Sequence, residues 1–169
     1  MKRLVLLAMT FPSACAGPAT VERRADTEVA EARWSEAFGV GDLAAGTPID
    51  PASFFPIRSI TKSYTVTVIL QLVRDQLARL DDKLDQFIPG FPNGDRITLA
   101  DLAGMQSGIG DYTENATFRQ LFGADLTRTF TEPQLAGYGR EESPQFEPGA
   151  QYQYSNTNTV LLGMVVEKI

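Results

Sequence analysis

The feature that most constrains the fold of this chain is an apolar stripe in residues 60–80. Apolar side chains recur there at spacings of three and four, which is the period of an amphipathic α-helix. The first part of the segment is rich in threonine, valine and isoleucine. These are indifferent helix formers, so the helix depends on burial against another layer of the chain. The stripe comprises Val66, Ile69, Leu70, Val73, Leu77 and Leu80.

A serine and a lysine stand where this helix is expected to begin. Pro56 and Ser59 precede the apolar pattern, and Lys62 completes an S-x-x-K motif. Residues three apart share a helix face, so the two side chains are within mutual reach. The unpaired N–H groups and the positive dipole end of a helix N-terminus stabilise negative charge that develops on Ser59. A lysine buried there gives up its proton more readily, which suits a proton acceptor.

The alternative interpretation makes Ser59 a helix N-cap and Lys62 a solvated surface lysine. Capping serines are common, so the motif alone does not decide between the two interpretations. The apolar residues directly upstream favour an enclosed site, namely Phe54, Phe55 and Ile57.

A second motif, Tyr154-Ser155-Asn156, lies far downstream. The chain has no histidine, which excludes a Ser-His-Asp triad within this polypeptide. Ser59, Lys62 and Tyr154 provide another arrangement, a nucleophile with its own acid and base partners. Alternatively, Tyr154 is a packed loop aromatic and Asn156 caps the last helix. Either motif alone could be a coincidence, but both in this order favour catalysis.

The sequence around Ser59 resembles that of a known family. Residues 55–65, FPIRSITKSYT, are similar to the nucleophile segment of serine β-lactamase-related proteins of the class C type. That group includes penicillin-binding D-alanyl-D-alanine carboxypeptidases and related esterases. The resemblance covers roughly residues 36–169 in the family's order. It continues through Gly39–Asp42, Leu80–Asp82, Ile88–Pro89, Ile97–Leu99, Gln106–Gly108, Pro148–Gly149 and the Tyr154 motif.

By this resemblance Ser59 is the acylated nucleophile, Lys62 its proton partner, and Tyr154 the general base or acid relay. Asn156 is expected to bind substrate and to help hold Lys62. The loop with Gly108, Gly110 and Asp111 is expected beside the cleft. The implied fold is α+β, β-lactamase/penicillin-binding-protein-like, with an antiparallel sheet and a helical region.

The implied activity is that of a serine hydrolase that forms an acyl-enzyme. Its substrate is expected to be a β-lactam, a D-Ala-D-Ala peptide of peptidoglycan, or an ester. We expect neither a cofactor nor a metal ion, and the oligomeric state is left open. The alternatives are a non-catalytic cell-envelope binding protein or relic with the same fold, and a plain lipoprotein whose motifs are coincidental.

The family's third motif is not found in this sequence. A Lys-Thr-Gly or His-x-Gly triplet is expected on a late strand, which also carries one oxyanion N–H donor, but nothing similar follows Asn156. We therefore expect residues 31–169 to be the N-terminal portion of such a domain, incomplete at the C-terminal end. As a fragment, the chain is expected to be weakly active or inactive.

The first 16 residues read as an export signal. Met1–Arg3 is basic, Leu4–Phe11 is apolar, and small residues follow. Cys15, the only cysteine, lies directly after the apolar run and resembles the lipidation site of a bacterial lipoprotein. Cleavage after Ala16 with soluble secretion is the alternative, and a buried N-terminal helix is a third. The expected location is the cell envelope, either membrane-anchored through Cys15 or periplasmic or secreted.

Composition fits one globular domain. The chain has 169 residues, of which 43% are hydrophobic and 21% charged. Its net charge of −6 disfavours nucleic-acid binding, which usually requires a basic patch.

Local signals suggest several further elements. Residues 17–30 are predicted to be a linker, Ala32–Phe38 a strand, and 144–153 a loop. Thr98 and Thr131 are predicted to open helices. A final helix is predicted to run to the last residue with an apolar face of Val160, Leu161, Met164 and Val165.

Overall fold

The computed structural model describes residues 36–169, which fall into two units divided between Phe54 and Phe55. The predicted signal, linker and Cys15 lie outside the described residues. The first unit contains an antiparallel hairpin of β1 (Val40–Asp42) and β2 (Thr47–Pro48). Part of the strand predicted for Ala32–Phe38 also lies outside the described residues, and 36–38 are irregular, so that prediction is wrong for the part described.

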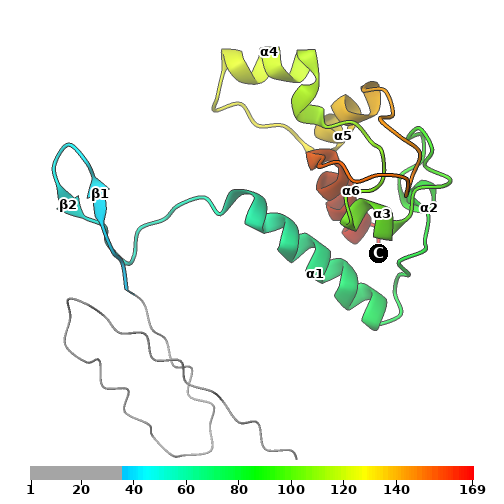
Figure 1. Ribbon diagram of the computed structural model, residues 1–169, viewed down its shortest axis with the longest axis horizontal. Helices are drawn as coiled ribbons and strands as arrows, with labels where there is room; N and C mark the ends of the chain where they lie inside the picture. Colours follow the sequence, from blue (N-terminus) through cyan, green and yellow to red (C-terminus); the bar gives the residue numbers. More distant parts are fainter. Residues whose placement is uncertain (1–35) are drawn as a thin grey trace, which may run out of the picture. The chain divides into compact units, whose positions relative to one another are not determined.

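The long helix α1 (Thr61–Arg74) follows directly on a short 3₁₀ turn, η1 (Arg58–Ile60), and extends along one side of the second unit (Figure 1). It ends well before residue 80, where the apolar stripe had predicted its end. The reason is a Schellman motif. Gln76 adopts a left-handed φ of +61°, its N–H donates to the Val73 carbonyl, and the Leu77 N–H donates to the Leu72 carbonyl.

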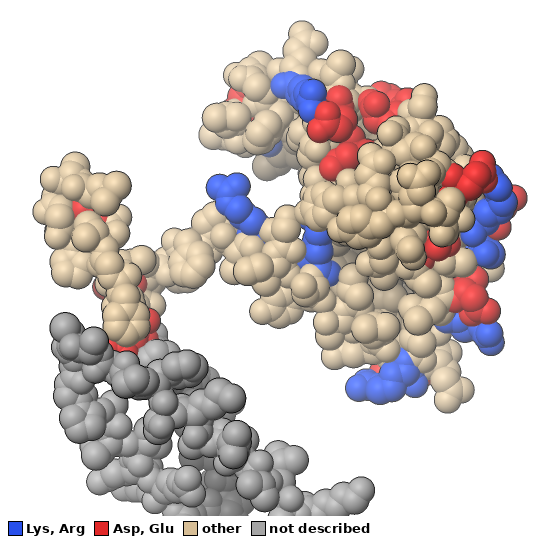
Figure 2. Space-filling model, in the orientation of Figure 1, with Lys and Arg blue, Asp and Glu red and all other residues tan. Residues whose placement is uncertain are grey.

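Only part of the predicted stripe reaches the core. Ile69 is fully buried, and Val66 and Val73 pack against the core from its edge. Leu70 and Leu77 are exposed, together with Leu80 beyond the helix. In Figure 2 the visible surface along α1 is largely uncharged, while acidic and basic side chains gather over the other elements.

The last helix, α6 (Asn156–Val166), packs against α1, α3 and α5 and forms the centre of the second unit. Leu161, Leu162 and Val165 are fully buried there, and Val160 and Met164 are partly buried. The predicted apolar face is therefore confirmed, although the helix ends at Val166 instead of the last residue. These contacts with three other helices fix the position of the first turn of α6, where Asn156 lies.

Two helix starts that the sequence predicted are present with their caps. Thr98 and Asp101 form a capping box on α3 (Leu99–Ala103). Thr131 and Gln134 form another on α5 (Glu132–Glu141), which has proline in its first turn. The loop predicted for 144–153 is also confirmed. The local signals in the sequence did not predict α2 (Leu84–Phe87), η2 (Tyr112–Glu114) or α4 (Ala116–Ala124).

Within residues 36–169, every helix is too short or too polar to cross a lipid bilayer.

Candidate active site

Ser59 lies in the middle of η1, immediately before α1. Its side chain does not cap the helix, since the N-cap position of α1 is Ile60 and makes no side-chain cap bond. Arg58 has a left-handed φ of +49°, which is unfavourable for a residue with a Cβ. Backbone strain of this kind is concentrated at functional sites, where the surrounding structure holds it. The geometry thus disfavours the simple capping role for Ser59.

The structure brings together the three residues that the motifs singled out. The Ser59 Oγ lies 2.8 Å from the Tyr154 hydroxyl, across 95 positions of sequence. Lys62 Nζ donates a hydrogen bond of 3.2 Å to the same Oγ. A nucleophile within hydrogen-bond reach of two groups that can exchange protons is the geometry that covalent catalysis requires.

Lys62 also shapes the electrostatics of Tyr154. Its Nζ lies 5.1 Å from the centre of the tyrosine ring. Lys62, and after it the hydrogen bond with Ser59, lowers the pKa of Tyr154, because both stabilise the phenolate. Desolvation and the nearby Asp111 carboxylate act in the opposite direction but do not cancel the effect. The phenolate of Tyr154, the form that can accept a proton, is therefore more populated at a given pH than that of an ordinary tyrosine.

The apolar enclosure expected around Ser59 is not formed by the described residues. Lys62 is only partly buried, and Tyr154 is 43% exposed. The upstream apolar residues Phe54, Phe55 and Ile57 are themselves exposed. Their hydrophobic character suggested a shielded site, but hydrophobicity alone does not show which partner covers a side chain.

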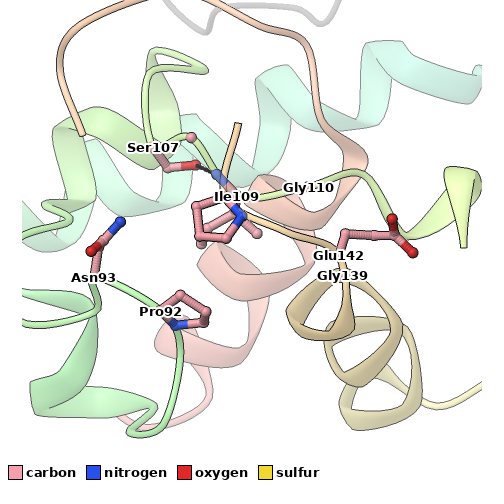
Figure 3. A pocket seen from close by; sticks show the side chains of 9 residues that line it. Pro92, Asn93, Ser107, Ile109, Gly110, Gly139 and Glu142 are labelled. Atoms are coloured by element: carbon pink, nitrogen blue, oxygen red, sulfur yellow. Dashed lines mark hydrogen bonds between the residues drawn. The ribbon is translucent and has the colours of Figure 1, made fainter. Parts of the chain in front are cut away.

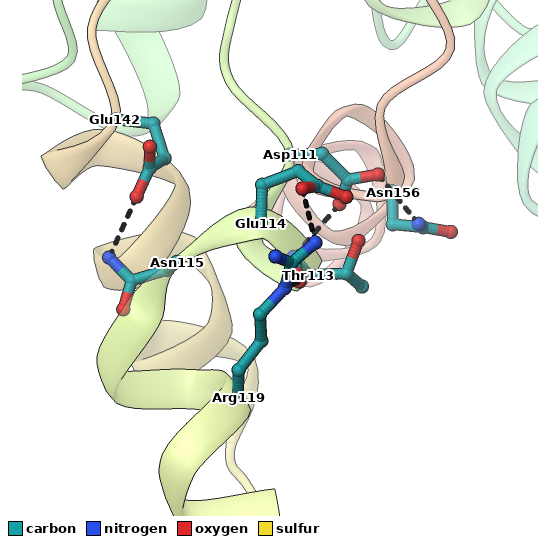
Figure 4. A network of polar contacts seen from close by, with 7 residues as sticks. All are labelled: Asp111, Thr113, Glu114, Asn115, Arg119, Glu142 and Asn156. Atoms are coloured by element: carbon teal, nitrogen blue, oxygen red, sulfur yellow. Dashed lines mark hydrogen bonds and ion pairs between the residues drawn. The ribbon is translucent and has the colours of Figure 1, made fainter.

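Asn156 is held by a residue that no motif predicted to bind it. Its Nδ2 donates a hydrogen bond of 2.8 Å to Asp111 Oδ2 (Figure 4). Its Oδ1 accepts from the Tyr154 hydroxyl at 3.4 Å. The expected contact with Lys62 is not among its hydrogen bonds. With one end on Asp111 and the other toward Tyr154, the Asn156 amide has a defined orientation.

The loop that carries Asp111 is tied to the first turn of α6. Thr157 Oγ1 donates to the Gly110 carbonyl at 2.7 Å and accepts from the Tyr112 N–H at 2.9 Å. Ser155 Oγ donates to the same Gly110 carbonyl at 3.2 Å. These bonds place Asp111 opposite Asn156 and confirm that the loop lies beside the residues that the resemblance assigned to the cleft.

The base of this loop is closely packed. Gly108 has a φ of +74°, and a Cβ there would collide with the Phe146 carbonyl oxygen. Ser107 Oγ donates a 2.5 Å hydrogen bond to the buried Asn158 side chain. The cavity beside Ser107 and Ile109 has a volume of only about 10 Å³ (Figure 3). It is at the lower limit for holding one water molecule, so this region supports the site and is not a substrate pocket.

The described residues include no group of three or more histidine, cysteine, aspartate or glutamate side chains placed to hold a metal ion. Ser59, Lys62 and Tyr154 by themselves provide a nucleophile with two groups that can exchange protons with it.

The sequence matches a known protein family over most of its length. Residues 24–169 match the Beta-lactamase family. The D-aminopeptidase of Cereibacter sphaeroides (strain KD131 / KCTC 12085) is 35% identical over 134 residues, which are 79% of this chain and 25% of that protein. Penicillin-binding protein 4* of Bacillus subtilis (strain 168) is 28% identical over 140 residues, or 80% of this chain and 29% of that protein. The chain thus spans about a quarter of the length of these curated relatives.

Solved structures give the same result for the fold. A D-stereospecific amidohydrolase from Streptomyces sp. is 39% identical with a TM-score of 0.64, over 68% of this chain and 36% of that one. A D-amino acid amidase from Ochrobactrum anthropi SV3 is 26% identical with a TM-score of 0.66, over 76% of this chain and 34% of that one. The predicted α+β fold is confirmed, and the chain belongs to the Beta-lactamase family.

Proposed function

We propose that this chain carries the nucleophile-bearing portion of a serine hydrolase that cleaves amides through an acyl-enzyme. The observation that carries the proposal is the position of the Ser59 Oγ, within 2.8 Å of the Tyr154 hydroxyl and 3.2 Å of Lys62 Nζ. Similarity to proteins named D-aminopeptidase and D-amino acid amidase supports amides of D-configured amino acids as substrates. Penicillin-binding relatives support β-lactams or peptidoglycan peptides as further acyl donors.

In the proposed reaction the Ser59 Oγ–H proton passes to the Tyr154 phenolate while Oγ bonds to the substrate carbonyl carbon. Lys62 stabilises the charge that develops on Oγ. Tyr154 then gives its proton to the leaving amine as the C–N bond breaks, which leaves an ester on Ser59. Water, deprotonated by the same tyrosine, attacks the ester and releases the acid, with the proton returning to Ser59.

We further propose that the mature protein acts at the cell envelope. The supporting observation is the basic and apolar N-terminal segment that ends at Cys15. Membrane fractionation in a bacterial host should find the wild-type chain with the membrane and Cys15→Ala released or unprocessed. A mature N-terminus at Gly17 would show soluble secretion instead.

The test of the catalytic proposal is covalent labelling. The chain should gain one adduct on prolonged incubation with a fluorophosphonate or a reactive β-lactam, as measured by intact mass. Ser59→Ala should gain none, while Ser63→Ala, a change at an exposed serine on the same segment, should label like the wild type. An adduct that persists in Ser59→Ala would refute the assignment. Binding of peptidoglycan fragments without any labelling would favour a non-catalytic envelope protein.

A further inference from the structure

An aromatic pocket lies beside the loop that holds Asn156. Its volume is about 540 Å³. Phe118 forms its centre, with ring centroids 5.0 Å from Tyr112, 5.6 Å from Phe122 and 5.1 Å from Phe130. Phe118 is nearly buried, whereas Phe122 is 41% exposed, so the cluster is packed at its base and open at its mouth. The lining consists chiefly of Tyr112, Phe118, Phe122, Gly123, Phe130 and Leu135.

The pocket offers aromatic faces and little free charge. Arg119 is the charged residue in its lining, and its guanidinium is already engaged. Its Nε donates to the Thr113 carbonyl at 2.8 Å, and its Nη2 pairs with Glu114 (Figure 4). The hydroxyl of Tyr112 stays neutral, since burial, followed by Asp111 and Tyr154, raises its pKa. Such a lining favours an uncharged aromatic group over a charged one.

The pocket wall is connected directly to the nucleophile site. Tyr112 is the next residue after Asp111, whose carboxylate holds Asn156. The backbone N–H of Tyr112 donates to the hydroxyl of Thr157, which follows Asn156 in α6. Tyr112 therefore separates the polar residues around Tyr154 from the aromatic cluster. The pocket therefore begins at the residue that follows Asp111, on the Asn156 side of the nucleophile site.

We propose that this aromatic pocket is a substrate subsite that binds an uncharged aromatic group of the amide or ester whose carbonyl is attacked by Ser59. This inference rests on the proposed acyl-transfer function. It adds a preference for aromatic over small aliphatic substrates, set by η2, α4 and the segment around Phe130.

Gly123 allows the pocket to be filled without disturbing the core. It lies in α4 and lines the pocket, and a Cβ built on it meets no atom within 4 Å. Gly123→Leu should therefore occupy the pocket, and leucine favours a helix more than glycine does. Gly137→Leu is the matched control, because Gly137 lies in α5, also has open space at its Cβ, and does not line this pocket.

Binding should be measured in the Ser59→Ala chain by saturation-transfer NMR, with phenylacetamide, acetamide and 4-carboxyphenylacetamide as probes. Phenylacetamide should bind best, and Gly123→Leu should weaken it about tenfold or more, which is the range for blocking an apolar pocket. Gly137→Leu should leave the affinity for phenylacetamide within about twofold of that of the Ser59→Ala chain. Equal binding of the three probes, or equal effects of the two leucine variants, would overturn the subsite.

Labelling separates the subsite from the proposed function. With Ser59 present, a phenylacetyl activated ester should acylate faster than an acetyl ester, and Gly123→Leu should remove that advantage. Aromatic binding without any Ser59 adduct would refute the acyl-transfer function but retain the pocket as a binding site. A Ser59 adduct that forms equally fast from both esters would refute the subsite alone.

Discussion

At the Ser59 hydroxyl, Lys62 and Tyr154 have complementary tasks. A lysine that donates to Oγ can stabilise an alkoxide but cannot at the same moment accept its proton. The tyrosine, with its pKa lowered by Lys62 and Ser59, is the better acceptor. The local geometry therefore favours Tyr154 as the base and Lys62 as the group that stabilises both phenolate and alkoxide.

Removing either partner should slow the chemistry far more than it affects the fold. Lys62→Ala and Tyr154→Phe should each reduce the acylation rate by about 10²- to 10⁴-fold, the usual contribution of an acid or base group. Neither side chain belongs to the buried core, so the midpoint of thermal unfolding should change little. The rate is measured by labelling kinetics and the midpoint by circular dichroism. Lys83→Ala serves as a control for the loss of a positive charge. Rate losses fully explained by unfolding would contradict these roles.

The pH dependence should follow Tyr154. Because only the phenolate accepts the proton, acylation should rise with pH, with a midpoint below the ordinary tyrosine pKa of about 10. Lys62→Ala removes the cation that stabilises the phenolate and should move the midpoint up. Asp111→Asn removes a negative charge that raises the pKa and should move it down. Ultraviolet difference titration, with Tyr154→Phe as the blank, measures the midpoint independently of activity. Shifts of the opposite sign would contradict this electrostatic account.

Motifs predicted Ser59, Lys62, Tyr154 and Asn156, but not the contact between Asp111 and Asn156. The motif residues carry chemistry that limits their type and local spacing. Asp111 is 45 positions from its partner, and its role depends on the packing of η2 against α6. A single aspartate in a glycine-containing loop gives no local sign of that contact. A turn role for it is equally compatible with the sequence.

At the scale of elements, helix starts were more predictable than helix ends. Thr98 and Thr131 are followed three residues later by side chains that return a hydrogen bond, which is a purely local signal. The end of α1 depends on the backbone of Gln76, and a polar residue other than glycine gives little warning of a left-handed φ. The N-cap of helix α4 is Asn115, whose side-chain amide also donates to Glu141 and Glu142 of a distant segment.

The two capping boxes should contribute unequally to the free energy of unfolding. Thr98→Ala should lower the free energy of unfolding by about 1 kcal/mol, the typical value for a lost N-cap. Thr98 is part of a part-buried network, with hydrogen bonds of 2.6 to 3.0 Å to Asp101. Thr131→Ala should cost less, because its cap bond is exposed and 3.4 Å long. Urea unfolding of both variants tests the order, and a larger loss for Thr131→Ala would contradict it.

At the scale of the whole molecule, much apolar surface lies along η1 and α1. A shallow groove of about 340 Å³ between α1 and α6 is open as well. Exposed apolar area of this extent favours association or aggregation. The exposed residues are Ile57, Ile60, Tyr64, Val68 and Leu70.

Because of this exposed apolar surface, the 169-residue chain on its own should be only marginally soluble. It should also be a poor catalyst, for a separate reason. The loss of one oxyanion donor costs about 10²- to 10³-fold in a complete enzyme. By resemblance, the family's third motif lies near such a donor. We expect slow labelling of Ser59 but negligible turnover of a chromogenic β-lactam or ester, with aggregation visible by light scattering. Rapid Ser59-dependent turnover by the monomeric chain would show that the third motif is dispensable here.

The bonds between the Gly110 loop and the first turn of α6 also have a dynamic consequence. The N–H of Tyr112 donates to the Thr157 hydroxyl, so this amide should exchange with solvent when that contact opens. The Gly110 carbonyl holds the hydroxyls of both Ser155 and Thr157, which makes the separate opening of loop or helix start costly. Loop and helix start should thus behave as one cooperative unit in hydrogen exchange. Tyr154 and Asn156 would then lose their alignment together, so each opening of this one unit should also take the site apart.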